Sequence, residues 1–212
     1  MPRVAAARHD EYAEARRDQI LQAALRLFSR KGFAESTVDE VAAEAGLGKA
    51  TIYLYFPSKE ILLRKLVDRF RLVPDLAEMV EAIRNQPPAS GIPALVEGIW
   101  RQLKERKEVA HVLVREVFSN PERARLYTEQ IRLPGRHLLA AYFEAWMKRG
   151  KLRRGNAEAM AQCLFGMLWY FLQSQELMGG KDLAPLSDQT ICSTVTGIFL
   201  NGAAAGNQRT LS

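Results

Sequence analysis

The sequence has few cysteines and histidines, two and three respectively among 212 residues. Cys163 and Cys192 stand far apart in apolar surroundings, so we expect buried free thiols of a reducing cytoplasm rather than a disulfide framework. The histidines His9, His111 and His137 have no metal-ligand spacing with one another or with the cysteines. We therefore expect no bound metal and no other cofactor.

Long apolar runs are also missing. The first residues, "MPRVAAARHDEYAEARRDQ", contain no apolar stretch of signal-peptide length, and no run approaches the ~18 residues of a membrane span. The enzyme motifs HExxH and GxSxG are absent, and no nucleophile constellation replaces them. The sequence predicts a cytoplasmic protein that is not an enzyme and does not bind a membrane.

Charge of one sign is only mildly in excess, with 30 Lys and Arg residues against 24 Asp and Glu residues. Apolar residues make up 48% of the chain and charged residues 25%, which is the balance of a globular protein that folds. A net charge of +6 is weak evidence for a nucleic-acid partner, because many proteins without one carry as much. The positions of particular residues must decide the function.

Helical periodicity dominates the chain, and no strand-like alternation interrupts it, so we expect an all-α fold of about nine helices. The expected helices cover about 10–30, 36–46, 49–56, a long fourth one from 58, 94–106, 108–119, 122–150, 156–178 and 187–201. Pro74 should kink or split the fourth helix, and Leu133-Pro134-Gly135 should kink the one over 122–150. Residues 85–93, "NQPPASGIP", form the clearest loop.

Residues 36–56, "STVDEVAAEAGLGKATIYLYF", have the spacing of two short helices joined by a sharp turn. Ser36 or Thr37 can cap the first helix, since an acidic residue follows three positions later in either register. Gly46 can adopt the positive φ that the turn needs. The residues able to form a small core between the two helices are Val41, Ala42, Ala45, Leu47, Ile52 and Tyr55. This is a helix-turn-helix pattern.

The outward positions of the second of these helices are those that enter the DNA major groove in a helix-turn-helix. They are Lys49, Ala50, Tyr53 and Leu54, with Thr51 at the side. Outward aromatic and apolar side chains need a partner: a tyrosine hydroxyl can bond a phosphate, and Leu54 or Ala50 can touch a thymine methyl group.

Together with "RDQILQAALRLFSRKGF", the segment "TVDEVAAEAGLGKATIYLYFPSKEILL" closely resembles the tetracycline-repressor (TetR) family of bacterial transcription regulators, over about residues 16–63. The family's phosphate contacts map by this motif onto Thr37, Tyr53, Tyr55 and Lys59, and its base-reading positions onto Lys49, Ala50, Thr51 and Leu54. Gly48 stands where the family usually has a capping serine or threonine, and Ala50 where glycine is common. These departures concern one phosphate contact and the base preference. The resemblance implies an N-terminal arm and DNA-binding domain at 1–57, and a helical ligand-binding and dimerisation domain at 58–212.

The stretch "CLFGMLWYFL", residues 163–172, is apolar on all sides, so we expect it in a buried helix or at a subunit interface. With the small residues of "TICSTVTGIFL", residues 190–200, it suggests two helices packing against a symmetry mate. The resemblance implies the same, a homodimer interface formed by the last two long helices. The expected interface residues are Met167, Tyr170, Ser174, Thr194 and Ile198.

The larger helical part, residues 58–212, is rich in aromatic residues, Tyr127 among them. Burial in a hydrophobic core is enough to explain them. The resemblance implies instead that some of them line a cavity for a small apolar or aromatic effector. The expected ligand-binding residues are Trp100, His111, Phe118, Phe143, Trp146, Phe165 and Trp169, with Arg115 and Glu116 as further polar contacts.

We therefore predict a homodimeric, ligand-responsive transcriptional regulator, a repressor released from a palindromic double-stranded DNA operator by a small apolar or aromatic molecule. One alternative is a constitutive DNA-binding dimer without an inducer, for which no small molecule changes DNA affinity. Another is a helical small-molecule-binding protein or enzyme with a remnant N-terminal part. A Tyr53→Phe, Lys59→Ala double mutant with unchanged DNA binding favours this second alternative.

Overall fold

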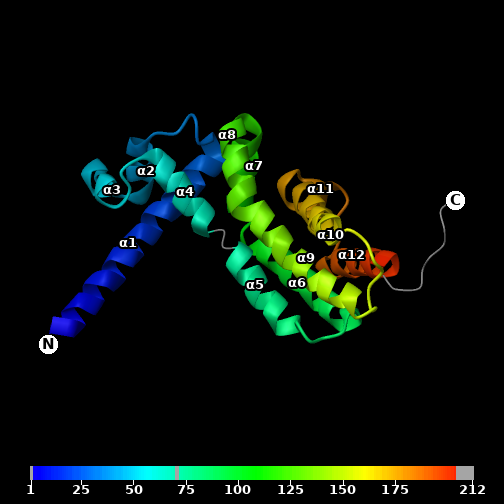
Figure 1. Cartoon of the computed structure of the whole chain (residues 1–212). Helices are drawn as coiled ribbons and strands as arrows, with labels where there is room; N and C mark the ends of the chain where they lie inside the picture. Colours follow the sequence, from blue (N-terminus) through cyan, green and yellow to red (C-terminus); the bar gives the residue numbers. More distant parts are fainter. Residues whose placement is uncertain (1, 70–71, 204–212) are drawn as a thin grey trace. The chain divides into compact units, whose positions relative to one another are not determined.

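The computed structural model describes the backbone of residues 2–69 and 72–203, and their side chains except at 2–10, 69 and 117–119. All regular structure in that part of the chain is helical, as predicted (Figure 1). The α-helices are α1 (Pro2–Lys31), α2 (Val38–Ala45), α3 (Lys49–Tyr55), α4 (Lys59–Arg69), α5 (Leu72–Ile83), α6 (Pro88–Glu105), α7 (Lys107–Ser119), α8 (Pro121–Tyr127), α9 (Leu133–Lys148), α10 (Ala157–Phe171), α11 (Gly180–Leu183) and α12 (Asp188–Ala203). Two π-helical segments, η1 (Thr128–Arg132) and η2 (Leu172–Leu177), complete them.

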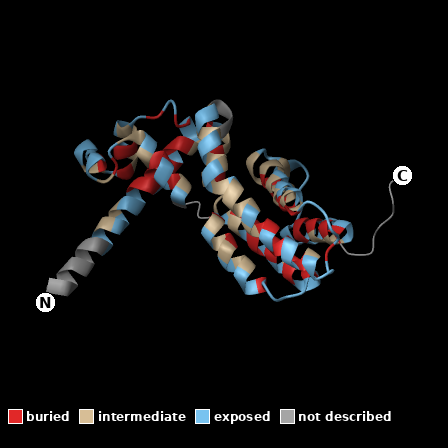
Figure 2. Ribbon diagram, in the orientation of Figure 1, coloured by how far each residue is buried: buried red, intermediate tan, exposed pale blue. Residues whose placement is uncertain are grey.

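The chain folds into two compact units, each with its own buried residues (Figure 2). The first comprises Met1–Phe70 and Glu108–Pro121, and the second Arg71–Lys107 and Glu122–Ser212. This division differs from the expected boundary after residue 57. The reason is packing, because Leu62 and Leu66 of α4 and Val112 of α7 are buried in the core of the first unit.

The helix ends of the first unit follow the predicted local signals. Gly32 ends α1 at a φ of 91°, in the left-handed region that favours glycine. Thr37 caps α2 in a capping box: its hydroxyl oxygen accepts from the Glu40 N–H at 3.2 Å, and the Glu40 carboxylate accepts from the Thr37 N–H at 2.9 Å. Gly46 ends α2 at a φ of 67°. The turn between α2 and α3 is therefore built as predicted.

Apolar burial and ion pairs together hold α2 against α1. Val41, Ala42 and Ala45 are buried in the same core as the apolar stripe of α1. On the surface, the Glu44 carboxylate accepts from Arg26 at 2.9 Å and from Arg30 at 3.1 Å. The hydrogen bonds from these guanidinium groups lower the Glu44 pKa.

In the second unit, α9 packs against α5 and α10, while α6 packs against α5, α10 and α12. The run from Pro121 to Lys148 is one helical path with a wider turn in the middle. Pro134 has no N–H to donate to the carbonyl four residues earlier. The N–H of the preceding residue, Leu133, bonds to the Thr128 carbonyl five residues back, which is the hydrogen-bond pattern of a π-helix. The expected kink at Leu133-Pro134-Gly135 thus takes the form of the π-turn η1.

Two predicted element boundaries need correction. Residues 88–93 are not loop but the first turns of α6, because Pro88 suits the first helical position, where no N–H is needed. The fourth expected helix is divided before Pro74: α4 ends at Arg69 and α5 begins at Leu72, with Pro74 in its first turn. Division of this and other long segments explains why more helices form than the expected nine.

One of the two thiols also differs from its prediction. Cys192 is buried and free, and burial raises its pKa to about 11. Cys163 is free but exposed, because it lies on the outer side of α10, away from the helices that α10 contacts within its unit. Within the described residues, no group of His, Cys, Asp and Glu side chains is arranged to hold a metal ion, and no helix is long and apolar enough to cross a membrane.

Candidate functional site

Helix α3 is held by one buried side and presents the other to solvent. Ile52 is fully buried and Phe56, its C-terminal cap, is 2% exposed, so both anchor the helix in the core of the first unit. Tyr53 and Leu54 between them are 43% and 79% exposed. An exposed leucine on a helix with a buried opposite face is a surface available to a partner.

Lys49 at the start of α3 is tied to α2. Its ammonium lies 2.7 Å from one Asp39 carboxylate oxygen and 6.0 Å from the centre of the Tyr53 ring. The hydrogen bond that Lys49 donates to the Asp39 carboxylate raises the Lys49 pKa, so the ammonium stays charged at neutral pH. Ala50 beside it is exposed and Thr51 is partly buried. The surface of α3 therefore combines a cation, a phenol and an apolar tip.

The Lys59 side chain, at the start of α4, is bonded to the protein's own backbone. Its ammonium donates to three backbone carbonyls, those of Phe33 at 2.8 Å, Ala34 at 3.2 Å and Ser36 at 2.8 Å. It also lies 4.4 Å from the centre of the Phe33 ring. An ammonium has three donors, and all three are used. In this structure Lys59 fastens the loop before Thr37, and its ammonium donors are used within the protein.

The other predicted phosphate contacts lie on the same unit. Thr37 is exposed, and its hydroxyl both accepts from the Glu40 N–H and donates to the Glu40 carboxylate at 3.0 Å. Tyr55 is partly buried against the core, and the Arg17 guanidinium lies 5.8 Å from its ring centre. Gly48 caps α3 without a side chain.

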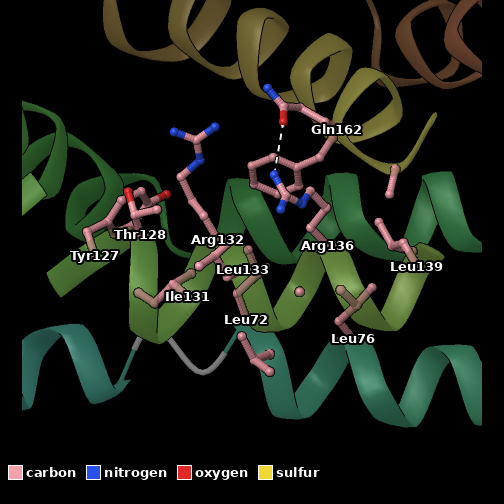
Figure 3. A pocket seen from close by; sticks show the side chains of 14 residues that line it. Leu72, Leu76, Tyr127, Thr128, Ile131, Arg132, Leu133, Arg136, Leu139 and Gln162 are labelled. Atoms are coloured by element: carbon pink, nitrogen blue, oxygen red, sulfur yellow. Dashed lines mark hydrogen bonds between the residues drawn. The ribbon is translucent and has the colours of Figure 1, made fainter. Parts of the chain in front are cut away.

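The second unit contains a cavity of about 680 Å³, counting its open mouth. It lies between α5, the run from α8 through η1 to α9, and α10 (Figure 3). Its apolar lining includes Leu72, Leu76, Ile131, Leu133, Leu139 and Phe165. A mostly apolar lining with a few polar groups is the composition of small-molecule sites.

The polar groups of the cavity lie on η1, α9 and α10. The Arg136 guanidinium donates to the Gln162 side-chain oxygen at 3.4 Å (Figure 3) and forms an ion pair with Glu158, whose second oxygen lies 3.6 Å from the His137 Nε2. Arg132 also lines the cavity, and the positive charge of its guanidinium lowers the pKa of the Tyr127 hydroxyl. Burial raises the Tyr127 pKa to about 12 although Arg132 opposes the rise, so this phenol is neutral at pH 7.

Two family models match the chain, one over the helix-turn-helix and one over the second half. Residues 20–66 match bacterial regulatory proteins of the tetR family, and residues 103–201 match the C-terminal domain of AefR-like transcriptional repressors. The chain belongs to the TetR family. It is a transcriptional regulator with a helix-turn-helix DNA-binding domain, and not an enzyme.

Relatives of this TetR-family protein extend over most of its length. The regulator YdgC of Bacillus subtilis, itself uncharacterised, is 27% identical over 191 residues, which are 88% of this chain and 94% of YdgC. The transcriptional repressor NicS of Pseudomonas putida is 26% identical over 77% of this chain and 78% of NicS. The crystal structure of a TetR-family regulator from Pseudomonas syringae shares the fold, with a TM-score of 0.68 and 24% identity, over 89% of this chain and 96% of that one.

Most of the expected effector contacts in this TetR-family regulator do not reach the cavity. Of the six whose side chains are described, only Phe165 lines it. The Trp169 ring stacks on Phe165 with ring centres 6.0 Å apart. The other three described aromatic residues of the set are buried core residues, namely Trp100, Phe143 and Trp146. The prediction that they contact the effector is corrected, because their rings pack against neighbouring helices. The Phe143 and Phe199 ring centres, for example, are 5.2 Å apart.

The remaining expected polar contacts lie in the first unit or outside the described side chains. His111, Arg115 and Glu116 belong to α7 in the first unit and do not line the cavity. Arg115 donates to the Ser29 carbonyl at 3.4 Å, and Glu116 is buried. The Phe118 side chain lies outside the described residues.

Tyr127 was among the aromatic residues noted in the sequence, whereas Arg132 and Arg136 were not predicted to line a cavity. Their spacing of four residues on a helical run, with Leu133 and Leu139 nearby, places two cations beside an apolar face. That spacing was a usable signal, since residues four apart lie on one side of a helix.

An apolar outer face runs along α10 and α12, which pack against each other. Tyr170 is 67% exposed and Ile198 61% exposed. Of the other expected interface residues, Thr194 is exposed, and Met167 and Ser174 are partly buried. Exposed Cys163 lies on the same helix as Tyr170, four and seven residues from Met167 and Tyr170 respectively.

Proposed function

We propose that this TetR-family regulator is a repressor that binds a palindromic operator as a homodimer and leaves it when a small molecule with an apolar or aromatic body enters the cavity of the second unit. The names of its relatives support the repressor role, since NicS is a repressor and the matching C-terminal family is one of repressors. The observation that carries the DNA-binding part is the outward face of α3.

On this proposal, the exposed residues of α3 enter the major groove. Lys49, Ala50, Thr51 and Leu54 are the base-reading positions, and Leu54 has the exposed apolar tip that a thymine methyl group contacts. Phosphate contacts come from Thr37, Tyr53 and Tyr55. Lys59 contributes indirectly, by holding the loop that precedes Thr37.

The dimer is proposed to form through the outer face of α10 and α12, with Met167, Tyr170, Ser174, Thr194 and Ile198 in contact. A two-fold axis would bring the same apolar patch of two copies together, which removes Tyr170 and Ile198 from water. Two α3 helices then read half-sites about 34 to 36 Å apart.

Release by an effector follows from linkage. The effector lowers DNA affinity only to the extent that it binds the DNA-free arrangement of the dimer more tightly than the DNA-bound one. The cavity supports this part of the proposal, because its mostly apolar lining with a few polar groups suits a small molecule.

Selection of bound sequences from a random duplex library tests the DNA-binding proposal. We expect a palindrome with half-sites about one helical turn apart, and an affinity that falls steeply with salt. Leu54→Ala is expected to weaken binding roughly fivefold and to relax the preference at one base pair. Leu126→Ala is the matched control, since Leu126 is also an exposed leucine of a short helix, in the second unit.

Enrichment of no motif by a folded dimer would contradict operator binding. Equal base preference in wild type and Leu54→Ala would remove Leu54 from the reading surface while leaving the operator intact. A defined operator whose affinity no small molecule changes would instead identify a constitutive DNA-binding dimer.

A further inference from the structure

We infer that the effector of this regulator is an amphipathic anion, a carboxylate on an apolar body whose charged end pairs with Arg132. The inference rests on the proposed function and specifies the chemical class that the cavity selects. It adds a charge requirement that the apolar lining by itself does not impose.

The apolar part of the ligand has a defined place. Leu72 and Leu76 of α5 lie opposite the run of η1 and α9 (Figure 3). Phe165 of α10 also lines the cavity. The Phe165 ring is backed by Trp169 at 6.0 Å, so it offers a supported flat face. An alkyl chain or an aromatic ring loses contact with water against these side chains.

The charge balance around the cavity favours an anion. Among the described residues that line the cavity, the charged side chains are Arg132 and Arg136, and none is a carboxylate. Three acids on the surrounding elements are paired with arginines: Asp75 with Arg106, Glu129 with Arg125, and Glu158 with Arg136.

Arg132 is the cation left for a ligand. Among the described residues, no carboxylate forms an ion pair with it, whereas Arg136 is held by Glu158 and Gln162. A guanidinium always carries its charge and offers paired N–H donors that match a carboxylate. This charge would repel a cationic ligand, and a neutral ligand would leave it without a counter-charge.

Neutral donors stand beside this guanidinium. Tyr127 and Thr128 line the same part of the cavity, and the Tyr127 phenol keeps its proton at neutral pH. The π-turn η1 presents Thr128, Ile131 and Arg132 to the cavity within a single turn. The site thus holds hydroxyl donors beside the Arg132 guanidinium, and apart from Arg136 and Gln162 the other described lining residues are apolar.

The test measures binding of two matched probe series to the full-length protein by calorimetry, without DNA. The first series is octanoate, octan-1-ol and octylammonium, and the second is 4-phenylbutyrate, 4-phenylbutan-1-ol and 4-phenylbutylammonium. We expect a carboxylate to bind about tenfold more tightly than its alcohol, and the ammonium compound to bind weakest. Arg132 is exposed, so the expected preference is at the low end for a charged hydrogen bond.

Arg132→Met is expected to remove the preference for the carboxylate while keeping the affinity for the alcohol. Arg125→Met is the matched control on the preceding helix, because Arg125 does not line the cavity, and it should bind every probe as wild type does. Thermal unfolding of both variants checks that they fold. Equal binding of carboxylate and alcohol in both series, no binding of any probe, or an unchanged preference in Arg132→Met overturns the inference.

Operator release is measured separately, by fluorescence anisotropy of labelled operator DNA with the same probes. Release by the carboxylates alone supports both the charge requirement and effector control. Release by the alcohols at equal concentration contradicts the anion inference and leaves the repressor proposal standing. Carboxylate binding through Arg132 without any release contradicts effector control, while the chemical class of the ligand is retained.

Discussion

The Lys49 ammonium lies 2.7 Å from a carboxylate oxygen of Asp39, so the cation of the recognition helix α3 is paired within the protein. Both side chains are more than half exposed, at 55% and 60%, so the pair contributes little to stability. On the proposed function we expect Asp39 to affect DNA binding, because a phosphate or base edge must compete with it for Lys49.

Asp39→Asn is therefore expected to raise operator affinity several-fold at low salt, since it removes both a competitor for Lys49 and a negative charge near DNA. Anisotropy titrations with labelled operator at several salt concentrations measure this. Asp68→Asn is the control, because it removes the acid of another exposed lysine pair, on α4. A loss of affinity in Asp39→Asn would show that Asp39 holds Lys49 in its binding position rather than withholding it.

Lys59→Met separates the observed role of Lys59 from a phosphate contact. Loss of three hydrogen bonds from an ammonium should lower the free energy of unfolding by roughly 1 to 2 kcal/mol and weaken operator binding. Because no phosphate contact is lost, the slope of log affinity against log salt should stay as in wild type. A direct phosphate contact predicts a slope smaller by about 1.8, because the dimer would lose one contact in each of its two protomers.

Gly46→Ala should destabilise the first unit by about 1 kcal/mol, because a side chain at a φ of 67° is strained whatever the space around it. Gly46→Asn should cost less, since asparagine tolerates the left-handed region better. Urea unfolding followed by circular dichroism measures both. A Cβ at this position has no neighbour within 4 Å, so a steric clash cannot explain the loss. Equal stabilities of the two variants would argue against backbone strain.

The pairing of Glu176 in η2 makes stability depend on pH. Burial raises its pKa, but the hydrogen bonds from Lys107 at 2.9 Å and Lys181 at 3.1 Å outweigh burial and hold the pKa below its ordinary value. A lowered folded pKa adds stability above the unfolded pKa of about 4.3, and this stability is lost as pH falls through the folded pKa.

Glu176→Gln should therefore lower stability at neutral pH and give a flatter decline on acidification below about pH 5. Thermal unfolding across a pH series measures the slope. Lys181→Met removes one of the two ammonium donors and should give an intermediate slope. A pH profile of Glu176→Gln that overlays that of wild type would contradict the assignment.

Ile198→Glu is expected to dissociate the dimer without unfolding the protomer, because Ile198 is 61% exposed and its replacement places a charge on the proposed interface. Sedimentation velocity measures the shift to monomer, and operator affinity should fall with it. Leu126→Glu is the control, since Leu126 is half exposed and lies off that face. A dimer unchanged in Ile198→Glu would place the interface elsewhere.

Local signals carried much of the prediction in the first unit. The left-handed Gly46 and the outward Leu54 depend on residues a few positions apart, so spacing predicts them. Spacing also predicts a capping box, but in two registers, and the structure selects Thr37 with Glu40. The Lys59 contacts escaped prediction because they join it to carbonyls 23 to 26 residues earlier. Local spacing does not predict which backbone oxygens, far away in the sequence, a side chain contacts in the folded protein.

By itself, the sequence determined the all-α class, the helix-turn-helix and the apolar character of α10 and α12, because periodicity, capping and turn glycines act over a few residues. Only the tertiary structure decided which aromatic residues are core and which line the cavity. Phe143 and Phe165 look alike in sequence, yet Phe143 is fully buried and Phe165 lines the cavity. The difference arises where several helices meet, since burial depends on neighbours that are distant in the chain.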